Sequence, residues 1–328
     1  MASERRSLAL VGAGSLLGRE ILQLLEGAKR QLGAVRALSE RTVGSALEWR
    51  GDDLQIERLD EAALEDPTLA LAIFCTGRER ARRWARKAAE RGLPVIDCSA
   101  AERHEPSVPL LGELSSPRPA SPYLSLPGAP AWMAAKLLQP LVGHGLRRLE
   151  ATLFVPASGK GSKGVRELSR QTAALLGAKA SGAKRFPHRI AFNLFPEVAG
   201  FEGEEDRAET AFRAELRRLL GVPGLEVGVT AVRAPLFFGL GATFSATTDR
   251  PIDPSSARKL WAATPGVKLL DDPARHVYPM PSLAAGDAAV LVGRVRSDRP
   301  GQLQLFAAVD SLQLVAQAAV AAALRLLP

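Results

Sequence analysis

The sequence has little cysteine, and this excludes several kinds of site. Cys75 and Cys98 are the only two cysteines among 328 residues. Two thiols are too few for a disulfide framework, and their spacing does not match that of zinc ligands, so we expect free thiols in a reducing compartment and no metal site. The four histidines His104, His144, His188 and His276 show no spacing that pairs them with either cysteine. The sequence therefore predicts no catalytic triad.

Long apolar runs are also missing. No stretch approaches the roughly 20 apolar residues that a membrane span requires. The first six residues are polar and charged, which is unlike a signal peptide. We expect a cytoplasmic protein without membrane contact.

The net charge of +8 is not gathered into a dense basic block. The stretch richest in arginine, residues 78–91, interleaves Trp84 and alanines at helical spacing, which is typical of the solvated face of a helix. We therefore expect no nucleic-acid partner. A small anionic ligand fits the same positive charge.

The first third of the chain alternates short apolar runs with helical patterns. Strands are predicted at residues 8–11, 34–38, 69–74 and 94–96, with helices around residues 17–25 and 79–90. Repeated strand–helix–strand units predict a doubly wound parallel sheet of the α/β Rossmann type. Residues 113–130 are rich in Pro, Ser and Gly, so we expect loops there and the exit from this domain.

The pattern changes after residue 129. Strands are predicted at residues 149–155, 225–232, 241–247, 289–296 and 303–309, with helices at 130–142, 163–176 and 205–220. This mixture predicts an α+β domain with helices on one face of a sheet. A final helix at 311–327 is expected to complete the first domain. The predicted boundaries are therefore 1–128 with 311–328, and 129–310.

A glycine-rich turn follows the first predicted strand. Gly12, Gly14 and Gly18 are spaced G-x-G-x-x-x-G, whereas the usual dinucleotide fingerprint is G-x-G-x-x-G. Glycines let the backbone approach a phosphate, and the following helix offers free N–H groups and the positive end of its dipole. We interpret the turn as a dinucleotide site, while a tight turn without ligand remains the alternative. The residues predicted to bind the cofactor here are Gly12, Gly14, Ser15, Leu16, Leu17 and Gly18.

The end of the second predicted strand bears on the choice of cofactor. Ser39 and Arg41 lie where the adenosine ribose of a dinucleotide would bind, and an arginine there suits the 2′-phosphate of NADP. Glu40 is a competing carboxylate, of the kind that binds the ribose hydroxyls of NAD. Arg41 favours NADP, although it could equally be a surface arginine.

An ordered set of motifs along the chain resembles the aspartate-semialdehyde dehydrogenase family. Beyond the glycine turn and Ser39–Gly44, the motifs are Val95-Ile-Asp-Cys-Ser-Ala-Ala-Glu-Arg103, Pro109-Leu-Leu-Gly-Glu113, Ser158-Gly-Lys-Gly161, Ile190-Ala-Phe-Asn-Leu-Phe-Pro196, Arg233-Ala-Pro-Leu-Phe-Phe-Gly239 and Tyr278-Pro-Met-Pro281. The resemblance implies a homodimer with an N-terminal NADP domain. It also implies cofactor contacts from Thr76, Gly77, Ser158 and Gly159.

The family reduces β-aspartyl phosphate with NADPH through a thioester on a cysteine, with a histidine as acid and base. The resemblance aligns the cysteine with Ala129, the histidine with Leu240 and the glutamine that orients the intermediate with Val155. The acid and lysine of the substrate site fall near Ala208 and Ala211. Neither alanine nor leucine can attack a carbonyl or transfer a proton. Each of these positions has therefore changed from polar to apolar.

An anion-binding set is retained. The resemblance aligns Arg103 with the phosphate-binding arginine and Arg233 with the carboxylate-binding arginine, although both could survive as structural ion pairs. We therefore predict a Usg-like paralogue that binds NADP and a small anion but lacks the catalytic pair. One alternative is an NADP-dependent oxidoreductase of amino-acid biosynthesis that uses Lys160 or Cys98 as proton donor. Another is a non-catalytic partner of a genuine dehydrogenase subunit.

Overall fold

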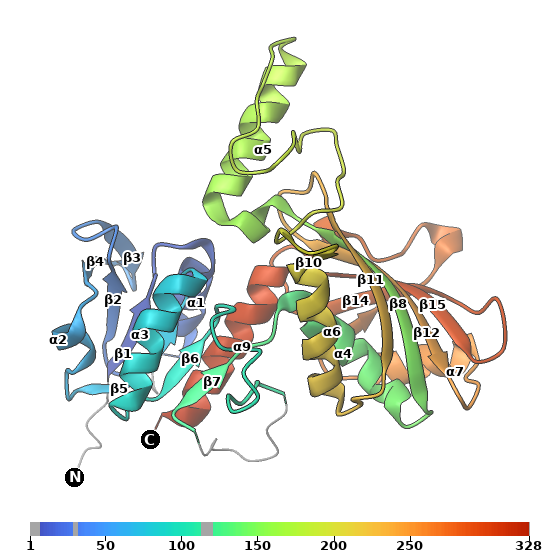
Figure 1. Cartoon of the computed structure of the whole chain (residues 1–328), viewed down its shortest axis with the longest axis horizontal. Helices are drawn as coiled ribbons and strands as arrows, with labels where there is room; N and C mark the ends of the chain where they lie inside the picture. Colours follow the sequence, from blue (N-terminus) through green and yellow to red (C-terminus); the bar gives the residue numbers. More distant parts are fainter. Residues whose placement is uncertain (1–6, 29–31, 113–120, 328) are drawn as a thin grey trace. The chain divides into compact units, whose positions relative to one another are not determined.

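The computed structural model describes residues 7–28, 32–112 and 121–327, which form two compact units. The first unit comprises residues 1–128 and 315–328, and the second comprises residues 129–314 (Figure 1). The charged first six residues and residues 113–120 of the expected loop lie outside the described part.

The first unit is built on a seven-stranded sheet in the order β3-β4-β2-β1-β5-β6-β7. Every neighbouring pair is parallel except the antiparallel pair of β3 and β4 at one edge. This arrangement confirms the predicted doubly wound fold. The strands are β1 (Ser7–Val11), β2 (Val35–Ser39), β3 (Ala46–Trp49), β4 (Asp52–Arg58), β5 (Leu69–Phe74), β6 (Val95–Asp97) and β7 (Tyr123–Ser125), and the helices are α1 (Leu16–Gly27), α2 (Glu61–Leu64), α3 (Arg78–Glu90) and most of α9 (Ser311–Leu326).

Two parts of this unit differ from the prediction. The hairpin of β3 and β4 was not predicted, because most of its side chains are exposed and several are charged. Its turn is formed by Arg50 and Gly51, both with positive φ. The prediction of loops throughout residues 113–130 was wrong at residues 123–125, where β7 pairs with β6. β7 is only three residues long and lies among prolines and serines, which hides it in the sequence pattern.

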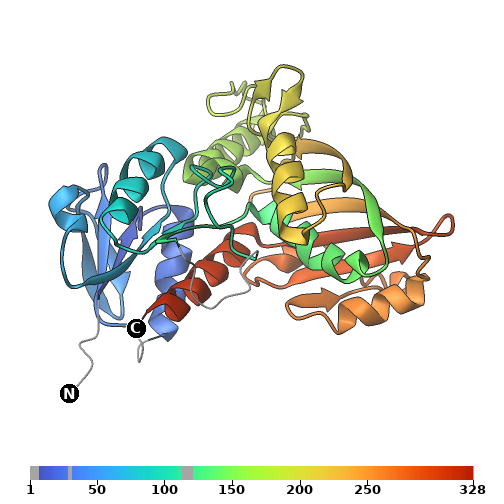
Figure 2. The ribbon, with the colours of Figure 1, turned by 60° about the horizontal axis from the view of Figure 1, so that its bottom comes forward.

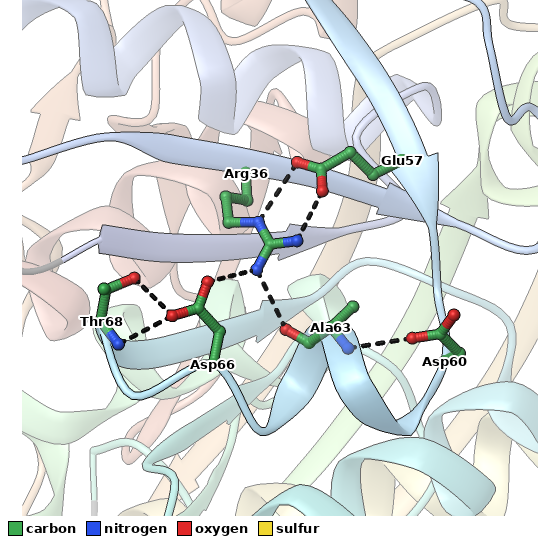
Figure 3. A network of polar contacts seen from close by, with 6 residues as sticks. All are labelled: Arg36, Glu57, Asp60, Ala63, Asp66 and Thr68. Carbon is green, nitrogen blue, oxygen red and sulfur yellow. Dashed lines mark hydrogen bonds and ion pairs between the residues drawn. The ribbon is translucent and has the colours of Figure 1, made fainter.

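Arg36 joins three elements at the edge of this sheet (Figure 3). From β2, its guanidinium donates to Glu57 of β4 at 3.2 Å and to Asp66, which follows α2, at 2.7 Å. The hydrogen bond to Glu57 is the main cause that raises the pKa of Arg36. The contact holds the added hairpin and α2 against the parallel core.

The second unit contains a six-stranded mixed sheet in the order β11-β8-β12-β15-β14-β13. Helices α4, α6 and α7 lie along one face of it (Figures 1 and 2), and the indole of the buried Trp261 on α7 donates to the carbonyl of Leu137 on α4 at 2.8 Å. Helix α7 and β13 were not predicted. The strands are β8 (Leu146–Val155), β11 (Glu226–Arg233), β12 (Leu240–Thr248), β13 (Val267–Leu269), β14 (Val290–Arg296) and β15 (Gln302–Val309), and the helices are α4 (Ala129–Val142), α6 (Arg207–Leu220) and α7 (Pro254–Ala262).

The remaining elements of this unit include helix α5 (Gly161–Leu176), which extends away from the sheet in Figure 1. Its buried side packs against Phe186, Ile190 and Phe195 in a small apolar cluster of its own. The short elements are η1 (Ala157–Lys160), β9 (Phe201–Glu202), β10 (Glu205–Asp206), η2 (Pro273–Arg275) and α8 (Pro281–Ala284). Of the helices in the described ranges, none combines the length and the apolar character needed to cross a bilayer.

Candidate functional site

The glycine turn after β1 is shaped partly by packing. Gly12 has φ +87°, and a Cβ there would lie 2.7 Å from the carbonyl oxygen of Cys75. A Cβ on Gly18 would lie 2.4 Å from the carbonyl oxygen of Gly12. These two glycines are therefore required by the close approach of α1 to β1 and β5, whether or not a ligand binds.

Gly14 differs from its neighbours. Its φ is ordinary, and the nearest described atom to a Cβ placed there would be Cδ1 of Ile56 at 3.6 Å, followed by Oγ1 of Thr42 at 3.8 Å. Packing does not require a glycine at this position. Ser15 caps α1 by accepting from the N–H of Gly18 at 2.9 Å, and Leu16 and Leu17 form the first turn. The turn thus combines an open backbone position with a helix N-terminus, the arrangement that binds phosphates.

The end of β2 lies beside this turn, because β2 pairs directly with β1. Oγ of Ser39 accepts from the N–H of Arg41 at 3.1 Å and of Thr42 at 3.3 Å, which folds the loop over the end of the strand. The Arg41 side chain is exposed. Glu40 accepts a hydrogen bond from Trp84 of α3.

The end of β5 lies on the other side of β1. The hydroxyl of Thr76 is buried and has no hydrogen-bond partner in the described ranges. Gly77 follows as the N-cap of α3. An unused buried hydroxyl beside a helix N-terminus is a position where a ligand could supply the missing partner.

A buried polar cluster follows β6. The carboxylate of Asp97 accepts from the Ser99 N–H at 2.8 Å and from the Tyr123 hydroxyl at 2.9 Å, and burial together with this carboxylate raises the pKa of Tyr123. Arg103 donates to the carbonyl of Ser99 at 2.8 Å. Arg103 is thus held against the loop that begins at Cys98.

The two thiols lie side by side at the ends of β5 and β6, one residue beyond the aligned pair of Phe74 and Asp97. The hydrogen bond to the neighbouring Cys75, followed by burial, raises the pKa of the Cys98 thiol well above its ordinary value. Since the thiolate is the reactive form of cysteine, Cys98 is a poor nucleophile at neutral pH.

In the second unit, one row across the sheet gathers several of the predicted site positions. Val155 of β8 is aligned with Arg233 of β11, and Leu240 of β12 is aligned with Val309 of β15. Since Gly241 is aligned with Phe154 in the antiparallel pair of β12 and β8, Leu240 lies next to Val155. Leu240 is only 1% exposed. The row is therefore apolar apart from Arg233.

Arg233 is 1% exposed, which is unusual for an arginine. Its Nη1 donates to the carbonyl of Pro156 at 2.7 Å and its Nη2 to that of Val198 at 2.9 Å. Burial lowers its pKa to about 10, and the charge of Asp206 acts in the opposite direction. Nε has no hydrogen-bond partner within the described residues. The guanidinium thus retains its charge and one unused donor.

The loop of η1 lies against this arginine. A Cβ on Gly159 would be 3.0 Å from Nη1 of Arg233 and 3.5 Å from Cγ1 of Val155. The hydroxyl of Ser158 is buried and makes no hydrogen bond to any described residue. Partial burial, and secondly the charge of Arg233, lower the pKa of Lys160. Ser158, Gly159 and Lys160 therefore form one group around Arg233.

Asp206 is a member of this region that the sequence did not reveal. It is fully buried, and its carboxylate accepts from the N–H groups of Val198, Ala199 and Ala208. It thereby caps α6 and holds the segment that supplies the Val198 carbonyl to Arg233. The available signal was an aspartate directly before a helical pattern.

The remaining predicted positions are apolar or scattered. Ala129 is the first residue of α4 and is 8% exposed, and Ala208 and Ala211 lie in the first turns of α6. His188 packs edge-on against Phe195, and His276 lies in the turn after η2. A search of the described ranges finds no group of three His, Cys, Asp or Glu residues that could hold a metal ion.

Comparison with known proteins gives consistent matches over the chain. A family model described as the semialdehyde dehydrogenase NAD binding domain matches residues 7–116, and one described as the semialdehyde dehydrogenase dimerisation domain matches residues 138–314. The aspartate-semialdehyde dehydrogenase of Aquifex aeolicus is 31% identical over 318 residues, which cover 93% of each protein. That of Synechocystis is 30% identical over 319 residues, covering 93% of this chain and 92% of the relative.

Solved structures match over the same extent. The aspartate semialdehyde dehydrogenase II of Vibrio cholerae complexed with ASA superposes with a TM-score of 0.92 at 26% identity, covering 99% of this chain and 98% of that one. A probable aspartate-semialdehyde dehydrogenase from Pseudomonas aeruginosa gives a TM-score of 0.89 at 29% identity, with 97% of each chain covered. These matches confirm the predicted pairing of a Rossmann-type domain with a second, dimerisation-type domain.

Proposed function

The chain belongs to the aspartate-semialdehyde dehydrogenase family, and from this premise we propose that it binds NADP and a small anion without carrying out the family's ordinary reaction. The observation that carries the proposal is the apolar row of Val155 and Leu240 beside the buried Arg233. Arg233 is retained, whereas its neighbours at the positions expected for the orienting amide and the acid–base residue are apolar.

The family's reaction needs a thiolate that attacks the acyl carbon and leaves after hydride transfer. Ala129 provides only a methyl group at the position aligned with this thiolate, and Leu240 provides no proton at the position aligned with the histidine. Leu240 is also sealed from solvent, so a water molecule has no access to replace an imidazole there. Three coordinated changes favour loss of this chemistry over a change of substrate.

The two cysteines of the chain do not supply a substitute. Both lie in the first unit at the ends of β5 and β6, and the pKa of Cys98 is raised, which keeps it protonated. A protonated thiol is neither a strong nucleophile nor a ready leaving group. We therefore assign the two cysteines a structural role at the edge of the sheet.

Three features of the first unit support cofactor binding. Gly14 leaves the backbone open at a position where packing does not require a glycine. Helix α1 begins directly after the turn. The buried hydroxyl of Thr76, beside the start of α3, has no hydrogen-bond partner in the described residues. The predicted contacts from Ser39 and Arg41 lie on the opposite side of the same turn. When bound, NADP would supply a hydride, and the residues named here would hold its phosphates and ribose.

We propose an anion site at Arg233 in the second unit, while anion binding by Arg103 in the first unit stays a separate prediction. Ser158 and Arg233 each have a buried polar atom without a partner in the described residues, and Lys160 adds positive charge beside them. Unpaired buried donors are costly unless a ligand or water completes them. A carboxylate or phosphate would complete both.

The open face of the second sheet supports a homodimer. Thr230, Thr152 and Thr243 form a row across β11, β8 and β12, on the face opposite α4 and α6, beside a hollow of about 1050 Å³. The family model over this unit is that of a dimerisation domain. We propose that a second copy covers this face.

The environment of Lys160 supports an enzymatic alternative. The lowered pKa of Lys160 makes it a better proton donor near neutral pH than an ordinary lysine, so a direct hydride transfer to an aldehyde or oxo group would have a proton source beside Arg233. An NADP-dependent activity that is abolished by Lys160→Met but not by Lys163→Met would favour this alternative.

A thermal-denaturation titration with NADPH tests the proposed cofactor. For one-site binding at a ligand concentration a hundredfold above Kd, the added stability is about 2.7 kcal/mol. We expect a saturable shift that is lost in the Gly14→Ala variant. A melting temperature that does not respond to NADPH would overturn the cofactor assignment.

A further inference from the structure

The carboxylate next to the expected ribose site is already engaged. Oε1 of Glu40, the first residue after β2, accepts a hydrogen bond from the indole Nε1 of Trp84 at 2.8 Å. Trp84 lies on α3, is 6% exposed and belongs to the apolar core of the first unit. A buried indole N–H needs an acceptor, so this contact fixes the direction in which the Glu40 side chain points.

Arg80 occupies the other oxygen of the same carboxylate. Its Nε lies 4.0 Å from Oε2 of Glu40, and both side chains are about one third exposed. Its Nη2 lies 3.9 Å from the position that a Cβ on Gly77 would occupy. The guanidinium is therefore held between the end of β2 and the beginning of α3, the two segments that flank the glycine turn after β1.

These two contacts change the role that Glu40 can have in the choice of cofactor. A free carboxylate after β2 would accept hydrogen bonds from ribose hydroxyls and would repel a 2′-phosphate. Here the carboxylate is turned toward α3 and balanced by Arg80. Nη1 and Nη2 of Arg80 are not used in the ion pair, and Arg41 adds a second guanidinium in the adjoining loop. The local charge therefore favours a phosphate monoester over a pair of hydroxyls.

We propose that Arg80 is a specificity-determining residue that binds the 2′-phosphate of the adenosine half of the cofactor, together with Arg41. Trp84 is a positioning residue, which withdraws the Glu40 carboxylate from the ribose. This inference rests on the proposed binding of NADP. It adds a discriminating contact from α3, an element outside the loop that the sequence pattern singles out.

The test uses two fragments that differ by one phosphate, 2′,5′-ADP and 5′-AMP, measured by calorimetric titration on the full chain. We expect the unaltered protein to bind 2′,5′-ADP more tightly. Arg80→Met is expected to reduce this preference about tenfold, the usual size of a lost charge-assisted hydrogen bond. Arg82→Met is the matched control, because Arg82 comes from the same helix but pairs with Glu102 and the Ala101 carbonyl.

A second set of variants tests the role of Trp84. Trp84→Phe keeps the apolar ring but frees the carboxylate, so the preference for 2′,5′-ADP should fall. Adding Glu40→Gln in the same chain should restore the preference, because the freed group then carries no charge. A merely structural role of Trp84 would leave the double variant as poor as the single one, and that result would overturn the positioning role.

The outcomes separate this inference from the proposed function. Equal binding of the two fragments by the unaltered protein, or an unchanged preference in Arg80→Met, would overturn the assignment of Arg80 alone. Failure of both fragments and of NADPH to bind would overturn the proposed cofactor, and the inference with it.

Discussion

Val155 lies directly opposite Arg233 in the parallel pair of β8 and β11. The fully buried guanidinium therefore has a valine as its neighbour in the sheet and Leu240 one strand further on. A charged group that is this well enclosed is held by the carbonyls of Pro156 and Val198. The row joins a retained anion-binding arginine to two positions that have lost their polar side chains.

Restoring the histidine is expected to be costly. Leu240→His would replace an apolar side chain that is 1% exposed with an imidazole, and burying a polar group without a partner costs about 1–3 kcal/mol. Urea unfolding followed by fluorescence measures the loss. Ala129→Cys serves as the comparison, because it adds one sulfur at the first residue of α4 and should change the free energy of unfolding much less. Equal stability of both variants would contradict the described burial of position 240.

The two glycines of the turn should respond differently to alanine. Gly12→Ala forces a positive φ and a close approach to the Cys75 carbonyl, so we expect a loss of at least about 1–3 kcal/mol of stability. Gly14→Ala meets only ordinary contacts, so the fold should keep its stability while NADPH binding weakens. Chemical denaturation and NADPH titration of both variants measure the two effects. A Gly14→Ala variant that binds NADPH as well as the unaltered protein would argue against phosphate binding at this turn.

Asp206 should be important for the stability of the second unit. Asp206→Ala would leave the N–H groups of Val198, Ala199 and Ala208 without their acceptor, at a cost of at least about 2 kcal/mol. Asp253→Ala is the matched control, since Asp253 caps α7 in the same way but is exposed. Thermal unfolding should show the larger decrease for Asp206→Ala. Similar decreases for both would mean that burial of Asp206 adds nothing to its role as a cap.

The raised pKa of Cys98 predicts a pH dependence. Because folding favours the protonated thiol, the native protein should react slowly with iodoacetamide at pH 8, and the rate should keep rising above the ordinary thiol pKa of about 8.5. The same shift contributes stability that is present at lower pH and is lost as the pH rises toward the raised pKa. Alkylation rates of native and urea-unfolded protein between pH 7 and 10 measure the effect. A native rate that levels off at the pH where the unfolded protein does would refute the raised pKa.

The elements that the sequence predicted well are those with strong local patterns. β5 is buried at all six positions and reads as one uninterrupted apolar run, and α3 combines buried alanines with exposed arginines at helical spacing. The hairpin of β3 and β4 has no such pattern, because most of its side chains are exposed and several are charged. The place of the hairpin in the sheet depends on the pairing of β4 with β2, and no local sequence pattern indicates this pairing.

Less of the candidate site could be predicted from the sequence, because the site depends on strand register. Val155 and Arg233 are far apart in the chain, and only the pairing of β8 with β11 makes them neighbours. Asp206 could be suspected as a helix cap, but its bonds to Val198 and Ala199 belong to an irregular segment. The link between Glu40 and Trp84 likewise joins two residues that are 44 positions apart in the chain.

The most direct test of the central claim is an assay of phosphate-dependent reduction of NADP with aspartate semialdehyde, using the purified chain and a genuine family enzyme as positive control. Because Ala129 and Leu240 supply neither a nucleophile nor a proton, we predict no turnover above the uncatalysed background, even where NADPH stabilises the protein. Turnover at the rate of an ordinary enzyme, about 1–1000 per second, would contradict the account.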